Sequence, residues 1–187
     1  CTLPWDTRSK MYFLSKPDFH ILIDKLLQEY VVIAPVLRER TVVFSEIGSW
    51  KEMALKVREE PAPGSYAAER NNEGSWFAYF SGADSVKRFL HPPRQPLFDA
   101  HRPENRAENG VHLSEVTPEA TRMAFVGLRP CDLRAVQVLD KVFGGEYPDV
   151  HYASRRKENF LLTVQCVSFG PNCFCTSVGS GPEAESG

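Results

Sequence analysis

Two stretches of the sequence decide the fold: residues 123–143, MAFVGLRPCDLRAVQVLDKVF, and residues 160–184, FLLTVQCVSFGPNCFCTSVGSGPEA. Each begins with a short apolar run, over 123–128 and 160–164, that is typical of a buried strand. Between the two runs, Asp132 opens a helical pattern in which apolar residues recur every three or four positions until a Gly-Gly pair ends it. The order strand, helix, strand predicts a βαβ unit within an α/β domain that is built on an open mixed sheet.

Four of the five cysteines lie in these two stretches. Cys131 comes just after the first predicted strand, and Cys166 comes just after the second. Carboxyl ends of parallel strands meet at one edge of a sheet, where open α/β sheets bind their ligands. Cys173 and Cys175 follow in a loop with Gly and Pro that is long enough to fold back to the same edge. We therefore expect the βαβ unit to carry a four-cysteine site at its strand carboxyl ends.

Four thiols in one place indicate a metal site, with iron–sulfur favoured over zinc. The spacing is neither the paired C-x-x-C of zinc ribbons nor the bacterial ferredoxin run, so structural zinc and redox-active or inert thiols stay open. Cys131 is expected at a helix N-terminus, which favours a thiolate, with Arg129 balancing its charge. An odd number of cysteines fits reduced thiols better than disulfides, and Cys1 at the chain end is left outside the site.

The most specific motifs are R-P-C-D-L at 129–133 and C-F-C-T-S at 173–177. They lie within three segments, GLRPCDLRAVQVLDKVF, YPDVHYASRRKENFLLTVQC and GPNCFCTSVGSGPEA. These segments resemble the amino-terminal domain of sulfhydrogenase β subunits and of the related anaerobic sulfite reductase A subunits. The similarity extends over nearly the whole chain.

The resemblance implies an iron–sulfur electron-transfer subunit of a multi-subunit cytoplasmic oxidoreductase, with other subunits as partners and no catalysis by this chain alone. It also implies that Cys131, Cys166, Cys173 and Cys175 ligate one 4Fe-4S cluster. In that family the α/β domain precedes a ferredoxin-like region with two further 4Fe-4S clusters, whereas this sequence stops before any such cysteine run. We therefore expect residues 1–187 to be a single α/β iron–sulfur domain of a longer subunit.

Composition excludes some other classes of function. The net charge of −2 gives no reason to expect nucleic acid as a partner. No apolar stretch approaches the length of a membrane span, so a cytoplasmic protein without membrane contact is expected. The glycine-rich run 177–182 fits a loop that approaches the cluster closely, or one that cradles flavin phosphate. A G-x-G without a following helix is weak evidence for a flavin.

The first half of the chain supplies scaffold elements. Residues 15–30 predict a capped amphipathic helix, and the short runs 31–35 and 41–44 predict a β-hairpin. The aromatic run WFAYF at 76–80 predicts a core strand.

The stretch 99–110 is expected to be an exposed loop or insertion, because it contains few large apolar residues. His101 and His112 could suggest a metal, but their spacing matches no helix-face pair with an acid. We interpret both as solvated loop histidines.

Overall fold

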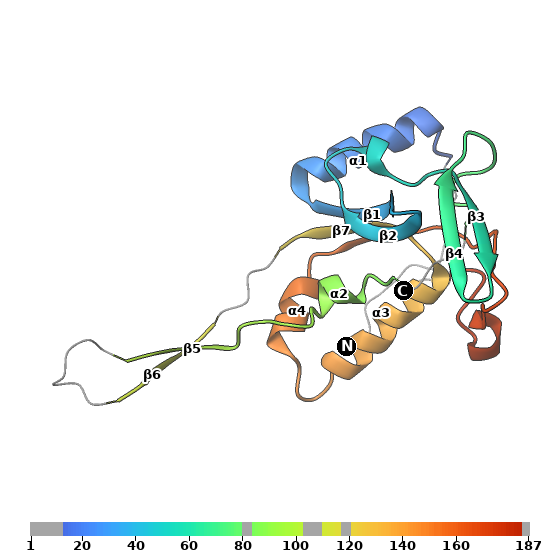
Figure 1. Cartoon of the computed structure of the whole chain (residues 1–187). Helices are drawn as coiled ribbons and strands as arrows, with labels where there is room; N and C mark the ends of the chain where they lie inside the picture. Colours follow the sequence, from blue (N-terminus) through green and yellow to red (C-terminus); the bar gives the residue numbers. More distant parts are fainter. Residues whose placement is uncertain (1–12, 80–83, 103–109, 117–120, 185–187) are drawn as a thin grey trace.

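The computed structural model describes residues 13–79, 84–102, 110–116 and 121–184. Within them, helices cover both faces of an open four-stranded sheet, and two further two-stranded ribbons lie beside it (Figure 1). In chain order the elements are α1 (Lys16–Glu29), β1 (Val31–Arg38), β2 (Thr41–Glu46), the 3-10 helix η1 (Trp50–Glu52), β3 (Val57–Ala62), β4 (Ser65–Arg70), α2 (Lys87–Leu90), β5 (Phe98–His101), β6 (His112–Glu115), β7 (Met123–Leu128), α3 (Pro130–Phe143), α4 (Val150–Arg156), β8 (Phe160–Thr163) and the 3-10 helix η2 (Cys175–Val178).

The sheet has the order β2-β1-β7-β8. β1 pairs antiparallel with β2 and parallel with β7, and β7 pairs parallel with β8. This arrangement confirms the open mixed sheet and the parallel pair predicted for the βαβ unit. The connection from β7 to β8 contains α3 and also α4, a short helix that the sequence patterns did not indicate. Since β7 and β8 are parallel neighbours, the chain leaves both strands at the same edge of the sheet.

β7 is the centre of the core, and all six of its residues are buried. Its side chains alternate between the two faces of the sheet, as a strand requires. Ala124 and Val126 pack into the cluster beneath α1, whereas Met123 and Phe125 pack into the cluster that includes Val136 of α3. A strand buried on both faces reads as a continuous apolar run, which explains why the sequence revealed it clearly.

The predicted first helix and hairpin are both present. Ser15 caps α1, and its hydroxyl oxygen accepts a hydrogen bond from the backbone N–H of Asp18 at 3.3 Å. The hairpin of β1 and β2 turns at Glu39 and Arg40, which both have positive φ (47° and 59°). Positive φ at both central residues is the hand of turn that suits the twist of a two-residue hairpin. Both strands extend beyond the predicted runs, because polar ends can continue a ladder of backbone hydrogen bonds.

The prediction of a strand over 76–80 is wrong for the residues that the structure describes. Residues 76–79 form turns and irregular backbone, although Phe77 and Tyr79 are buried. Phe77 has a positive φ of 57°, which is incompatible with a regular strand. The aromatic side chains therefore reach the core from a loop. Phe80 lies outside the described residues.

The polar stretch before this loop forms an antiparallel ribbon of β3 and β4, which the sequence did not predict. Its charged residues alternate poorly with apolar ones, so no period of two was visible.

β5 and β6 form a second antiparallel ribbon, an arm that projects away from the sheet (Figure 1). All eight of its strand residues are exposed. The described part of the expected loop 99–110 is thus exposed, but it includes a strand, and residues 103–109 lie outside the described residues.

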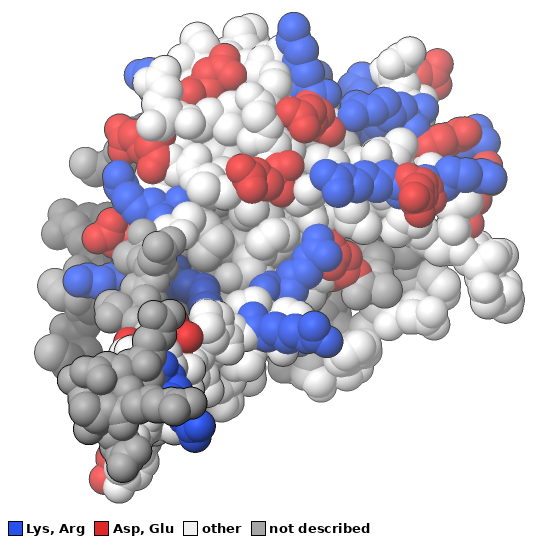
Figure 2. All heavy atoms as spheres, turned by 60° about the vertical axis from the view of Figure 1, so that its left-hand side comes forward, with Lys and Arg blue, Asp and Glu red and all other residues white. Residues whose placement is uncertain are grey.

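Charge is mixed over the surface. On the face drawn in Figure 2, basic and acidic side chains are interspersed over the described residues. Among the described residues, Arg58 and Glu60 form an ion pair at 2.6 Å. In the part of the chain that the structure describes, no helix has both the length and the apolar character needed to cross a membrane.

Candidate functional site

Cys131 lies on a fixed corner, where the chain leaves β7 and enters α3. Arg129 is the N-cap residue of α3. Its backbone N–H donates a hydrogen bond to the buried carboxylate of Asp132 at 3.0 Å. Pro130 occupies the first helical position, where a missing N–H costs nothing. The cap and the proline begin α3 immediately after β7. The backbone of the sheet therefore sets the position of Cys131.

The thiol of Cys131 does not favour the thiolate as the sequence suggested. Desolvation is the largest cause that raises the pKa of Cys131 to about 11, and the neighbouring carboxylate of Asp132 raises it further. Backbone N–H groups at the start of α3 lower the pKa, as expected for a helix N-terminus, but the other effects outweigh them. A metal cation would invert this balance and deprotonate the thiol.

The prediction that Arg129 balances the charge of Cys131 is wrong. The side chain is only 2% exposed, and its Nη2 donates hydrogen bonds to the backbone oxygens of Phe77 and Tyr79. Its guanidinium lies 4.9 Å from the centre of the Tyr79 ring. Arg129 therefore fixes the irregular 76–79 segment against the corner. Buried carbonyl groups need hydrogen-bond donors, and no sequence pattern indicated that a loop would place two carbonyls beside Arg129.

The other three cysteines lie in the long segment that follows β8. The thiol of Cys166 donates to the carbonyl oxygen of Ser168 at 3.1 Å, and the sulfur of Cys173 accepts a hydrogen bond from the N–H of Gly170 at 3.3 Å. Cys175 begins the short helix η2. Like Cys131, all three are free thiols. Each has local partners, as expected of a segment that is shaped by its own backbone.

The segment closes back on the corner. The N–H of Cys166 donates to the carbonyl of Pro182 at 3.4 Å. A Cβ at Gly181 would lie 3.4 Å from the sulfur of Cys175 and 3.5 Å from the Cβ of Pro130. Gly181 therefore lies between the C-F-C motif and the residue that precedes Cys131. The glycine at 181 permits this close approach of the backbone. That the run also lies against a cluster stays a prediction.

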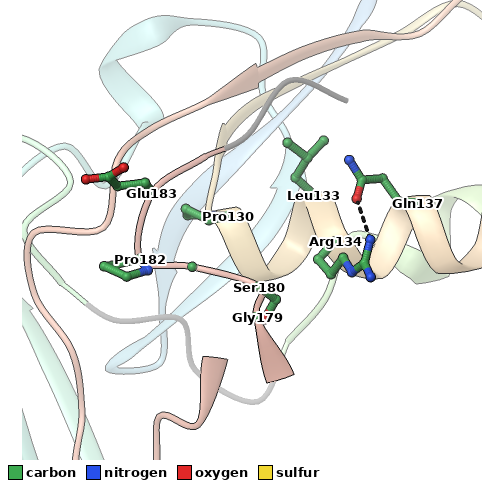
Figure 3. A pocket seen from close by; sticks show the side chains of 9 residues that line it. Pro130, Leu133, Arg134, Gln137, Gly179, Ser180, Pro182 and Glu183 are labelled. Atoms are coloured by element: carbon green, nitrogen blue, oxygen red, sulfur yellow. Dashed lines mark hydrogen bonds between the residues drawn. The ribbon is translucent and has the colours of Figure 1, made fainter. Parts of the chain in front are cut away.

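A pocket of about 250 Å³ lies between the start of α3 and this returning run (Figure 3). It is lined by Pro130, Leu133, Arg134, Gln137, Gly179, Ser180, Gly181, Pro182 and Glu183. Sites that enclose a cofactor-sized ligand usually have about 300–1,000 Å³. The pocket could take part of a ligand, and nothing in its lining is specific for a flavin.

The structure thus brings the cysteine-bearing segments to one edge of the sheet without gathering their thiols into a shell. Cys131 and Cys166 are close enough for Cys166 to raise the pKa of Cys131 electrostatically. Among the described residues, however, no three His, Cys, Asp or Glu side chains converge as metal ligands. The donor set fits an iron–sulfur cluster in chemistry and in topology. The fit requires movement of side chains in the segment after β8, where most residues are exposed.

Large apolar side chains are exposed around the cysteines of this segment. Val167, Phe169, Phe174 and Val178 are between 55% and 81% exposed. Exposed aromatic residues next to a candidate redox site are typical of surfaces that dock a protein partner. The sequence contained this signal in the residues around the C-F-C motif, but periodicity could not show their exposure.

Comparison with known proteins found one relevant relative. The chain is 26% identical over 149 residues to a protein named Sulfhydrogenase 2 subunit beta from Pyrococcus furiosus. The match covers 80% of this chain and 35% of the relative, so the chain spans about a third of that subunit's length. No family model matches the chain, and no solved structure matches it. The resemblance indicated by the R-P-C-D-L and C-F-C-T-S motifs is thereby confirmed: over 80% of its own length, this chain is similar to a sulfhydrogenase β subunit.

Proposed function

We propose that this chain is an iron–sulfur electron-transfer module of a multi-subunit, hydrogenase-type redox complex. One 4Fe-4S cluster would be held by Cys131, Cys166, Cys173 and Cys175. The observation that carries the proposal is the exit of β7 and β8 at one edge of the sheet, each followed by a cysteine, with the Gly181 run returning to the same corner. The similarity to a sulfhydrogenase β subunit supports a redox role within a complex.

In this proposal the residues of the chain have separate tasks. The corner at Cys131 supplies one fixed ligand, and the segment after β8 supplies three that adjust. A 4Fe-4S cluster would supply one-electron transfer. Backbone N–H groups near the sulfurs, such as the group that Gly170 directs at Cys173, tune the potential through hydrogen bonds.

Partner subunits fit the apolar surface beside the site. Phe169 is 81% and Phe174 is 68% exposed, and burial of both against another subunit would exclude water from the cluster. A short path between the cluster and a partner's redox group needs such a contact. We place the complex in the cytoplasm, because cysteines stay reduced there and remain available for assembly of a cluster.

The rival functions use the same residues differently. A structural zinc site would need four thiolates but no redox change. A thiol- or flavin-dependent reductase would cycle Cys173 and Cys175 between thiols and a disulfide, so it should largely keep its activity in Cys131→Ser.

Anaerobic purification with metal and sulfide analysis tests the proposal. We expect a brown protein with about four iron and four sulfide per chain, whose visible absorbance bleaches with dithionite. Cys131→Ser should lower the iron content by roughly tenfold or more, because it removes a direct ligand. Cys1→Ser is the matched control and should keep the iron of the parent protein. A colourless protein with stoichiometric zinc, or full iron in Cys131→Ser, would overturn the proposal.

A further inference from the structure

The arm formed by β5 and β6 brings together His101 and His112, which are eleven residues apart in the sequence. His101 and His112 lie directly opposite each other in the antiparallel register. Their rings are stacked, with centroids 5.6 Å apart and planes inclined by 21°. The sequence pattern indicated two solvated loop histidines, because neither residue forms a helix-face pair with an acid. A strand pair produces the same proximity through register.

The two faces of the arm differ in chemistry. Cross-strand partners project from the same face of a ribbon. His101 and His112 therefore lie on the same face as a second cross-strand pair, Asp99 and Ser114. The opposite face presents Phe98, Ala100, Leu113 and Glu115. One face of the ribbon therefore gathers imidazole, carboxylate and hydroxyl groups, all of which can ligate metals.

Cross-strand histidines have the spacing that a chelating pair needs. Directly opposed residues have Cβ atoms about 4.5–5.5 Å apart. Two imidazole nitrogens bound to one Zn²⁺ at about 2.0–2.1 Å from the metal must approach to about 3 Å from each other. Both side chains are exposed, so rotation about their χ angles can turn the stacked rings toward a shared ion. Imidazole suits late first-row divalent cations better than Mg²⁺ or Ca²⁺.

A bound ion would stabilise the arm, which has little other support. All eight of its strand residues are exposed, and β5 and β6 pair only with each other among the described strands. A two-stranded hairpin without packing support is marginally stable at best in water. A ligand that binds only the paired form stabilises it by mass action. A metal that joins the two strands would therefore act as a staple.

We propose that His101 and His112 form a binding site for a late first-row divalent cation, of the Zn²⁺ or Ni²⁺ class, that staples the arm. The imidazoles supply two ligands, and water completes the coordination. The site is separate from the cysteine segment, because the arm and the segment after β8 lie at opposite ends of the molecule in Figure 1. The inference is independent of the proposed electron-transfer function.

Titration of the full chain with Ni²⁺, followed by the imidazole proton signals in NMR spectra, tests the site. The chain has five histidines, so His20, His91 and His151 serve as internal references. We expect the signals of His101 and His112 to broaden together, at Ni²⁺ concentrations well below those that affect His91, which is also exposed. Cysteine-bound Ni²⁺ would not produce this pattern, because it would sit at the other end of the molecule.

Matched variants separate chelation from single-histidine binding. His101→Gln or His112→Gln should weaken Ni²⁺ binding to the remaining arm histidine by roughly tenfold or more, and His91→Gln should leave it unchanged. Zn²⁺ should slow hydrogen exchange in residues 98–101 and 112–115 of the parent chain but not of either arm variant. Independent broadening of the two histidines, or equal affinity in the single variants, would overturn the proposal.

Discussion

The corner at the end of β7 and the segment after β8 present their cysteines on very different supports. At the corner, Leu128, Arg129 and Asp132 are all buried. The helix α3 begins two residues after the last residue of β7. Over residues 165–184, by contrast, Gly170 alone is buried, and the backbone is held by scattered local hydrogen bonds. A segment of this length with little secondary structure is usually functional. The fold therefore fixes the position of Cys131 and leaves Cys166, Cys173 and Cys175, the other three proposed ligands, on a segment with few buried contacts.

The largest expected effect comes from the buried cation at the corner. Arg129→Met keeps much of the side-chain volume but leaves the carbonyls of Phe77 and Tyr79 without their donor. Each buried carbonyl without a partner costs about 1–3 kcal/mol, so we expect unfolding to become easier by about 2–5 kcal/mol. Denaturant midpoints at constant m-value would measure the loss.

Arg134→Met is the control for that variant, because Arg134 lies on the same helix but is exposed and bonds only to Gln137 in the described contacts. Its effect should stay within about 0.5 kcal/mol. Equal losses in the two variants would mean that the corner is no more rigid than the helix surface, and the contrast between corner and segment would disappear.

A smaller loss is expected from the glycine that shapes the end of β7. Gly127 has a φ of +80° at an irregularity in the β7–β8 register, and a Cβ there would lie 2.8 Å from the ring of Phe77. Gly127→Ala combines backbone strain with overpacking, so we expect destabilisation by about 1–3 kcal/mol. Gly145→Ala is the matched control, since its nearest neighbour, the Lys141 carbonyl, lies 3.8 Å from the added atom. Thermal unfolding of both variants beside the parent chain would show whether the strain is local to the corner.

The same contrast explains what the sequence could predict. Apolar periodicity identified β7, α3 and β8, because these elements are stabilised by burial and burial selects residues with a regular period. The corner's partners could not be predicted, since Arg129 bonds to a loop about fifty residues earlier in the chain. For the same reason, the sequence predicted a strand over 76–80, whereas among the described residues Phe77 and Tyr79 are buried on an irregular backbone. The arm's histidine pair also depends on register, which composition does not reveal.

The positions of the cysteines in sequence were predictive of topology but not of side-chain geometry. Strand ends located Cys131 and Cys166 at one edge of the sheet, because parallel strands share a direction. The placement of Cys173 and Cys175 depends on turns such as that at Gly170, whose N–H bonds to the Cys173 sulfur. Each local hydrogen bond of this kind contributes only about 0.5–1.5 kcal/mol to stability. It produces no periodic pattern in the sequence.

Hydrogen exchange on metal-free and cluster-reconstituted protein would sharpen the contrast between the two supports. In metal-free protein, amides of Gly170, Cys173 and Ser180 should exchange much faster than that of Phe125 in β7, because few buried contacts hold them. Reconstitution should slow the three segment amides by roughly 10–100-fold, equivalent to about 1.4–2.7 kcal/mol, and leave Phe125 unchanged. In Cys131→Ser the slowing should be absent, because the corner's ligand is missing even though the segment is intact. If the segment were already as protected as β7 without iron, its three cysteines would be preorganised after all, and the cluster would have to fit the thiols where they now lie.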